Sequence, residues 1–140
     1  MKVDSGMALA HLDRDSDFRD HVRVYLHRFT GEFVSVYEDD ECHESVMAGA
    51  ELNAEARLEV ESDPAGFVEI PVPDHVLIHQ WFREFLESED RAYEYSGSIG
   101  RWLYSHNDKH RHAWSNFRGD RVCDLLTKTA EVAGVTLELC

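Results

Sequence analysis

The fold of this 140-residue chain is decided by residues 22–37, whose sequence is VRVYLHRFTGEFVSVY. Two runs rich in β-branched and aromatic residues, 21–29 and 33–37, flank a short connection that contains Gly31. Such runs favour β-strands, and a glycine in a three-residue connection supplies the positive φ that a tight turn needs. Residues 22–37 are therefore predicted to form an antiparallel β-hairpin.

Outside the hairpin, the sequence predicts two further strands, at 67–70 and at 135–139, and several helices. Residues 67–70 alternate as a short strand, and the prolines that follow either place it at a sheet edge or mark its end. Ala, Glu and Leu favour a helix in the acidic region, and helical spacing of apolar residues predicts the later ones. The predicted helices cover 46–61, 75–88, 98–106 and 113–133.

These elements predict an α+β fold in a single domain, residues 1–140. A small antiparallel sheet, led by the hairpin at about 22–37 and joined by 67–70, carries three to five helices packed on one face. The elements do not alternate as strand, helix, strand, which argues against a doubly wound parallel sheet. A chain of this length buries enough surface for a hydrophobic core without disulfide or metal support.

The bulk composition excludes several classes of partner. The chain carries 28 acidic and 14 basic residues, a formal net charge of −14, which argues against non-specific binding to nucleic acid or anionic membranes. No apolar run approaches the ~20 residues of a membrane span. The three cysteines, Cys42, Cys123 and Cys140, include no C-x-x-C pair and are expected to be reduced thiols. We therefore expect a soluble, cytoplasmic protein.

The charge is unevenly distributed along the chain. Residues 38–63 contain ten acids against Arg57 alone, whereas residues 101–121 contain five bases against two acids, and aromatic residues lie among the bases. The favoured interpretation is that these two blocks pair with each other and hold the fold together. The alternative is a site for a protein partner or a small anionic ligand. Its candidate residues are Arg101, Trp102, Arg111, Trp114, Arg118 and Arg121.

His75 and His79 are the candidate metal ligands. They stand four residues apart on a predicted helix, so both side chains can face the same way, as two ligands of a zinc site do. No glutamate follows His75 as it does in H-E-x-x-H. A third ligand would have to come from elsewhere, for example Cys42 or His43.

No arrangement of residues typical of a catalytic site is found in the sequence. No serine lies in G-x-S-x-G, and residues 96–100 contain two glycines but lack the Lys-Ser/Thr of a phosphate-binding loop. We therefore predict no catalytic residues and no cofactor, and a non-enzymatic binding or regulatory module. The alternative is a metal-dependent enzyme or a metal-stabilised protein that uses His75 and His79.

Several stretches of the chain occur in the order seen in a known family. They are the hairpin residues 25–34, the strand and helix residues 67–71 and 81–85, and residues 114–118 and 131–135. On these stretches the chain resembles the bacterial uncharacterised protein family 0158. Members of that family tend to have a basic Gly-Lys-Gly stretch before the Trp-x-x-Phe-Arg element, to which only residues 100–103 correspond here. The resemblance implies an α+β fold and contributes no catalytic residues.

Overall fold

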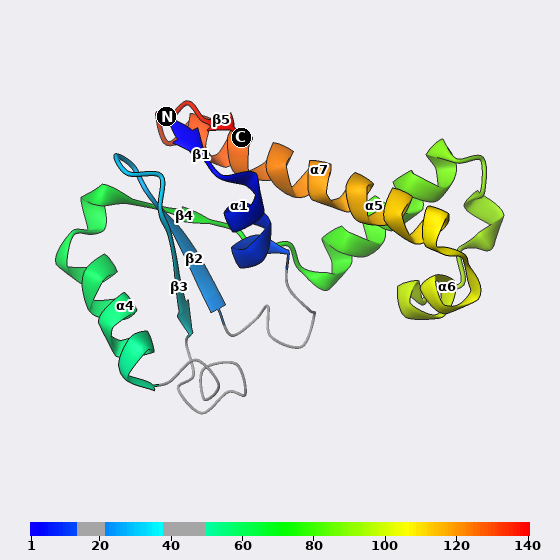
Figure 1. The fold of residues 1–140 in the computed structure, drawn as a ribbon, viewed down its shortest axis with the longest axis horizontal. Helices are drawn as coiled ribbons and strands as arrows, with labels where there is room; N and C mark the ends of the chain where they lie inside the picture. The colour runs from blue at the N-terminus through cyan, green and yellow to red at the C-terminus, as the bar shows by residue number, and fades with distance from the viewer. Residues whose placement is uncertain (14–21, 38–49) are drawn as a thin grey trace.

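The computed structural model describes residues 1–13, 22–37 and 50–140, and its course is shown in Figure 1. The strands are β1 (Lys2–Val3), β2 (Val22–His27), β3 (Phe33–Tyr37), β4 (Phe67–Ile70) and β5 (Glu138–Leu139). The α-helices are α1 (Ser5–Leu12), α4 (Ala50–Ser62), α5 (His75–Ser88), α6 (Ile99–Ser105) and α7 (Asp108–Val132). Two 3₁₀ turns are η1 (Pro64–Gly66) and η2 (Ala92–Glu94). The predicted α+β class is confirmed.

The hairpin predicted from residues 22–37 is formed by β2 and β3. Both neighbours of β2 are antiparallel to it, in the order β3-β2-β4, so the strand predicted at 67–70 lies at an edge, which is one of the two placements that its prolines allowed. Gly31 has a φ of 75° in the connection. Strand β2 ends at His27 because the His27 ring Nδ1 accepts hydrogen bonds from the backbone N–H groups of Phe29 and Thr30, which turns the chain.

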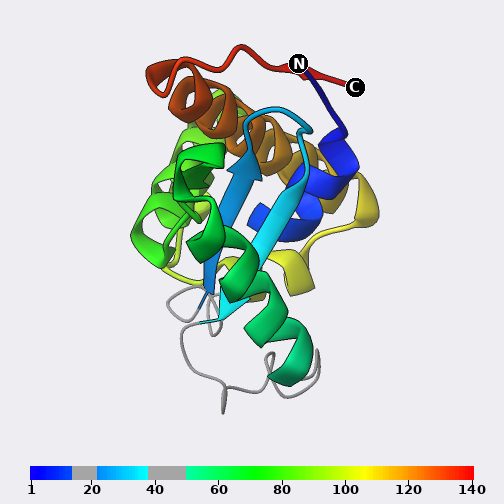
Figure 2. The same ribbon diagram turned by 90° about the vertical axis from the view of Figure 1, so that its left-hand side faces the viewer.

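The core lies on one face of this sheet. Val22, Val24 and Leu26 alternate along β2 and are buried, and helices α1, α5 and α7 contribute the other buried side chains of the same cluster. Helix α4 lies beside β3 instead, as Figure 2 shows. The buried Asn53 side chain on α4 accepts a hydrogen bond from the Tyr37 N–H at 2.9 Å and donates one to the Tyr37 carbonyl at 3.2 Å. An amide side chain therefore continues the hydrogen bonding of the sheet at this edge.

The helices follow their local capping signals. Helix α5 covers the predicted residues 75–88, and the Asp74 carboxylate accepts a hydrogen bond from the Leu77 N–H at 2.8 Å at its start. Helix α6 covers 99–105 of the predicted 98–106. Helix α4 begins at residue 50, and the earlier part of the predicted 46–61 lies outside the described residues.

Helix α7 is longer than predicted. It begins at Asp108, five residues before the predicted start, because the Asn107 side chain accepts a hydrogen bond from the His110 N–H. Its end agrees with the prediction, since Gly134 has a φ of 84° and the Val135 N–H reaches back to the Ala130 carbonyl.

The two ends of the chain lie together. Strands β1 and β5 form a parallel pair, with Lys2 opposite Glu138 (Figure 1). The final strand predicted at 135–139 is thus limited to its last residues, Glu138 and Leu139. In the part of the chain that the structure describes, no helix combines the length and the apolar character needed to cross a bilayer.

Candidate functional site

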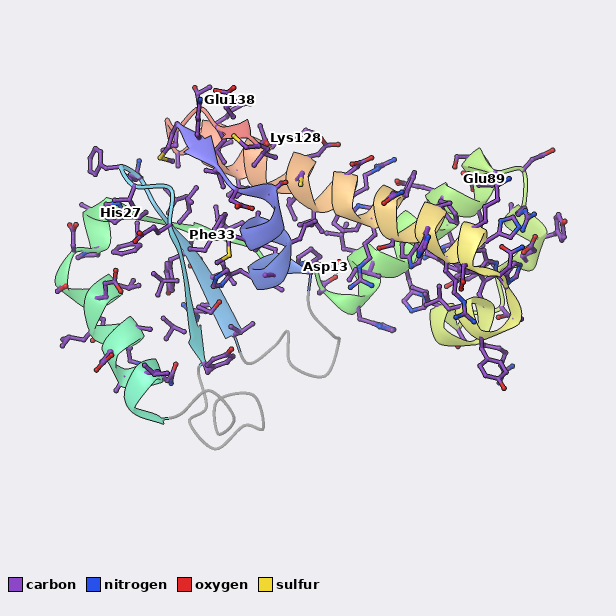
Figure 3. All side chains as sticks on the ribbon, in the orientation of Figure 1. Asp13, His27, Phe33, Glu89, Lys128 and Glu138 are labelled. Atoms are coloured by element: carbon purple, nitrogen blue, oxygen red, sulfur yellow. The ribbon has the colours of Figure 1, made fainter. Side chains whose placement is uncertain are left out.

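The basic segment of residues 101–121 runs through α6 and the first half of α7. Arg118 Nη2 lies 2.6 Å from Asp13 Oδ1 at the end of α1, and Arg121 Nη1 lies 2.8 Å from Glu84 Oε2 on α5. Both arginines therefore join α7 to a neighbouring helix. Side chains across the molecule are drawn in Figure 3, which labels Asp13.

Pairing between this segment and the acids of residues 38–63 is the favoured prediction from the sequence. The two ion-pair partners just described, Asp13 and Glu84, lie outside that segment. Helices α4 and α6 stand at opposite ends of the molecule, so the acids of α4 lie far from the start of the basic segment (Figure 1). The part of the prediction that concerns residues 38–49 lies outside the described residues.

Trp102 and Trp114, which are among the candidate ligand-binding residues, are core residues. Their side chains are 4% and 2% exposed, and both rings contact those of Phe82 and Phe85 at centroid distances between 5.0 and 5.9 Å. Neither indole ring face is therefore accessible to a ligand from solvent. The basic segment thus supplies tryptophans to the core and leaves other side chains at the surface.

The exposed residues of this region gather at the tip of the molecule, which we define as residues 91–112, from η2 through α6 to the first turn of α7. Tyr93 and Tyr104 are 84% and 88% exposed there. Arg101, Lys109 and Arg111 are exposed as well. Neither tyrosine was among the candidate residues from the sequence. The sequence signal that could have identified them is an aromatic residue that does not fit the apolar spacing of its helix.

A carboxylate holds η2 against α6 within the tip. Glu94 Oε1 accepts a hydrogen bond from Trp102 Nε1 at 3.0 Å and lies 2.6 Å from His106 Nε2. Arg91 Nη1 lies 3.6 Å from the other oxygen, Oε2. Burial raises the pKa of Glu94, but the hydrogen bonds from Trp102 and His106, together with the Arg91 charge, outweigh it and leave this pKa below its ordinary value.

The junction between α6 and α7 is held by Arg111. Its Nε donates to the Leu103 carbonyl at 2.6 Å and to the His106 carbonyl at 3.1 Å, so it satisfies carbonyl groups at the C-terminal end of α6. Arg101, on the first turn of α6, remains exposed. Of the four candidate arginines, Arg118 and Arg121 join helices, Arg111 caps one, and Arg101 faces solvent.

The two candidate metal ligands do lie together. The rings of His75 and His79 have centroids 4.3 Å apart on successive turns of α5, and His79 Nδ1 is 3.2 Å from the Tyr95 hydroxyl. Burial, followed by the charges of His75 and Arg83, lowers the pKa of His79, which favours the neutral form that binds metals.

No third protein ligand joins this pair among the described residues. No group of three or more His, Cys, Asp or Glu side chains with metal-ligand geometry occurs within residues 1–13, 22–37 and 50–140. Cys42 and His43, the candidates for a third ligand, lie outside these ranges. The arrangement can thus offer two imidazole nitrogens to a cation and leave its other positions to water.

A groove of about 460 Å³ opens between α4 and the sheet face opposite the core. Its lining includes Arg23 and Tyr25 from β2 and Arg57 from α4. Arg23 Nη1 lies 3.9 Å from Glu69 Oε1, and Arg57 Nη2 donates to the Tyr37 carbonyl at 2.8 Å. Both guanidinium groups therefore have structural contacts, and the groove is a weaker candidate than the tip.

Similarity to known proteins identifies neither the tip nor the histidine pair. The resemblance to uncharacterised family 0158 stays a prediction that rests on the stretches between residues 25 and 135. The chain matches no family model, no curated protein and no solved structure.

Proposed function

We propose that the protein is a non-enzymatic binding module that holds an acidic segment of a partner protein at its tip. The observation that carries this proposal is the exposure of Tyr93 and Tyr104, at 84% and 88%, on two short elements that are joined by a partly buried hydrogen bond. Tyrosine is enriched at protein interfaces because it offers a large contact area at a low cost in conformational entropy.

The charge of the tip supports an acidic partner. Arg101, Lys109 and Arg111 are exposed in a chain whose net charge is −14. An acidic partner is repelled by most of this surface and attracted here, so the local charge reversal favours docking at one place. Arg118 and Arg121, which were also candidates for this contact, are in ion pairs, so the proposed contact lies at the end of the molecule instead.

A displayed-peptide library selected on the immobilised protein tests the proposal. We expect enrichment of peptides rich in Asp and Glu, and we expect those peptides to lose at least about tenfold in affinity for the double variant Tyr93→Ser/Tyr104→Ser and for Arg101→Glu. Leu58→Ser and Val132→Ser are matched controls, because both side chains are exposed hydrophobics away from the tip, at 66% and 91%. Equal binding by the tip variants and the controls would refute the proposal.

The close approach of His75 and His79 favours a second candidate function, a metal-dependent or metal-stabilised protein. Two imidazoles with centroids 4.3 Å apart can share one zinc ion, although the nearby Arg83 charge opposes a cation. Elemental analysis of protein purified without chelator measures this directly. A content below about a tenth of a metal ion per chain would rule out this second function. The control for the variants His75→Gln and His79→Gln is His112→Gln, which changes an exposed histidine.

A further inference from the structure

The two ring nitrogens of His106 both face oxygen acceptors. Nε2 lies 2.6 Å from Glu94 Oε1, and Nδ1 lies 2.7 Å from the Trp102 carbonyl oxygen. A neutral imidazole carries one N–H and can donate to only one of these oxygens, whereas an imidazolium carries two. The Ser105 hydroxyl, 3.1 Å from Nδ1, has its own acceptor in the same carbonyl at 3.0 Å. The geometry is thus the one that a doubly protonated ring satisfies.

The same ring is stacked on an aromatic face. The centroids of His106 and Trp102 are 4.2 Å apart and their planes differ by 22°. A cation over an indole face is attracted by the negative face of the ring. Since Trp102 also donates its Nε1–H to Glu94, the carboxylate, the imidazole and the indole make a closed set of contacts between η2 and α6.

Three further charged or titratable residues, Arg91, His110 and Arg111, surround this set. From the start of η2, Arg91 approaches Glu94 at 3.6 Å. From α7, the His110 ring lies 5.7 Å from that of His106, and Arg111 Nε donates to the His106 carbonyl. Arg91 Nη2 lies 3.3 Å from His110 Nε2, and because a guanidinium only donates, that His110 nitrogen is an acceptor. The surroundings of the two rings thus differ, because His106 faces two oxygen acceptors and His110 faces a guanidinium donor.

We propose that the tip is a pH-responsive element in which doubly protonated His106 clamps η2 to α6, and in which loss of one proton releases η2 with its exposed Tyr93. Histidine is the side chain whose charge ordinarily changes between pH 5 and 8. Deprotonation removes one of the two hydrogen bonds that His106 donates, either to Glu94 or to the Trp102 carbonyl, and removes the cation from the indole face. The clamp does not depend on the proposed binding function; a partner held at the tip would dissociate more readily at higher pH.

Two-dimensional ¹H–¹⁵N NMR of the whole chain tests the clamp without any partner. We expect the Trp102 Nε1–H signal of the wild type to move in a single transition between pH 5.5 and 8.5. We expect no such transition in His106→Gln, and we expect it to persist in His110→Gln and in the exposed control His112→Gln. A Trp102 signal that stays fixed in the wild type, or that moves equally in His106→Gln, would overturn the proposal.

Hydrogen exchange supplies a second readout on η2 itself. The Glu94 N–H donates to the Arg91 carbonyl at 2.9 Å, so its protection reports whether η2 is formed. After correction for intrinsic exchange, we expect protection to fall on the order of tenfold from pH 5.5 to 8.5 in the wild type, the effect of losing one hydrogen bond to a charged group. Protection that does not change with pH would contradict the release of η2.

A second variant keeps the proposal falsifiable if His106→Gln does not fold. Glu94→Gln retains an oxygen that can accept from Trp102 Nε1 but removes the negative charge beside the imidazolium. We expect the midpoint of the Trp102 transition to move to lower pH in this variant, because the protonated ring loses its counter-charge. An unchanged midpoint would show that the transition does not come from the pair of His106 and Glu94.

Discussion

Replacing Phe82 by alanine should remove the side chain that joins the tip to the body of the protein. Phe82 is fully buried, and its ring centroid lies 5.0 Å from that of Trp114, 5.3 Å from Trp102 and 6.2 Å from Tyr95. These neighbours belong to α7, to α6 and to the segment after η2, whereas Phe82 itself lies on α5. The Phe82 ring on α5 thus contacts α6, α7 and the segment between η2 and α6.

The expected loss is large relative to the total stability of such a domain. Truncation of a buried phenylalanine to alanine costs about 3–5 kcal/mol, which includes the cavity left behind. With its aromatic contacts, Phe82 is expected near the middle of that range, at about 4 kcal/mol, against a total of about 5–15 kcal/mol. With a urea m-value of about 2 kcal/mol per M, the unfolding midpoint should fall by about 2 M.

Urea unfolding followed by far-UV circular dichroism measures this change. The control is Val76→Ala on the same helix, whose side chain is 70% exposed and whose loss should cost less than about 0.5 kcal/mol. Phe82→Leu, which keeps an apolar side chain but no ring, should fall between the two. If the Phe82→Ala midpoint lies within about 0.5 M of the wild-type midpoint, the aromatic cluster does not hold these elements together.

Two further predictions follow from the displaced pKa values. Since the pKa of Glu94 is lowered in the folded state, its charge stabilises the fold above the ordinary carboxyl pKa, and this contribution is lost as the pH falls through the folded value. The stability difference between wild type and Glu94→Gln should therefore shrink between neutral pH and about pH 3, and a difference that is constant with pH would contradict the shift. Burial, followed by the Asp120 and Asp124 charges, raises the pKa of Cys123, so at pH 8 iodoacetamide should alkylate it more slowly than the exposed Cys140. Peptide mass mapping compares the two rates, and Asp120→Asn should increase that of Cys123; equal rates at the two cysteines would exclude the effect.

The elements that the sequence predicts well are those specified by neighbouring residues. Helix α5 has its N-cap at Asp74 and an apolar stripe that contains Trp81 and Phe85, so its start, end and buried face all agree with the prediction. The hairpin is equally local, because alternation and Gly31 determine it. The early start of α7 was missed because residues 108–112 are polar and show no apolar spacing; the signal was the cap at Asn107.

The candidate site was harder to predict because it depends on contacts between distant residues. Trp102 and Trp114 stand among basic residues in sequence, but their helices turn both rings into the core. The partners of Arg118 and Arg121 come from α1 and α5, and no pattern along the chain indicates them. The contact between Glu94 and His106 likewise joins two short elements across a turn, so the His106 clamp is visible only in three dimensions.

The separation of charge along the molecule has a physical consequence for binding. Helix α7 has 25 residues and is thus about 37 Å long, and it carries the basic segment away from the sheet and from α4, which lies at the other end (Figure 1). Charges exposed to physiological salt are screened over about 8 Å. The acids of α4 therefore cannot neutralise Arg101 or Lys109 at the tip, as they would if the two blocks were folded against each other. This separation supports the proposed docking of an acidic partner at the tip, where exposed bases lie beside two exposed tyrosines.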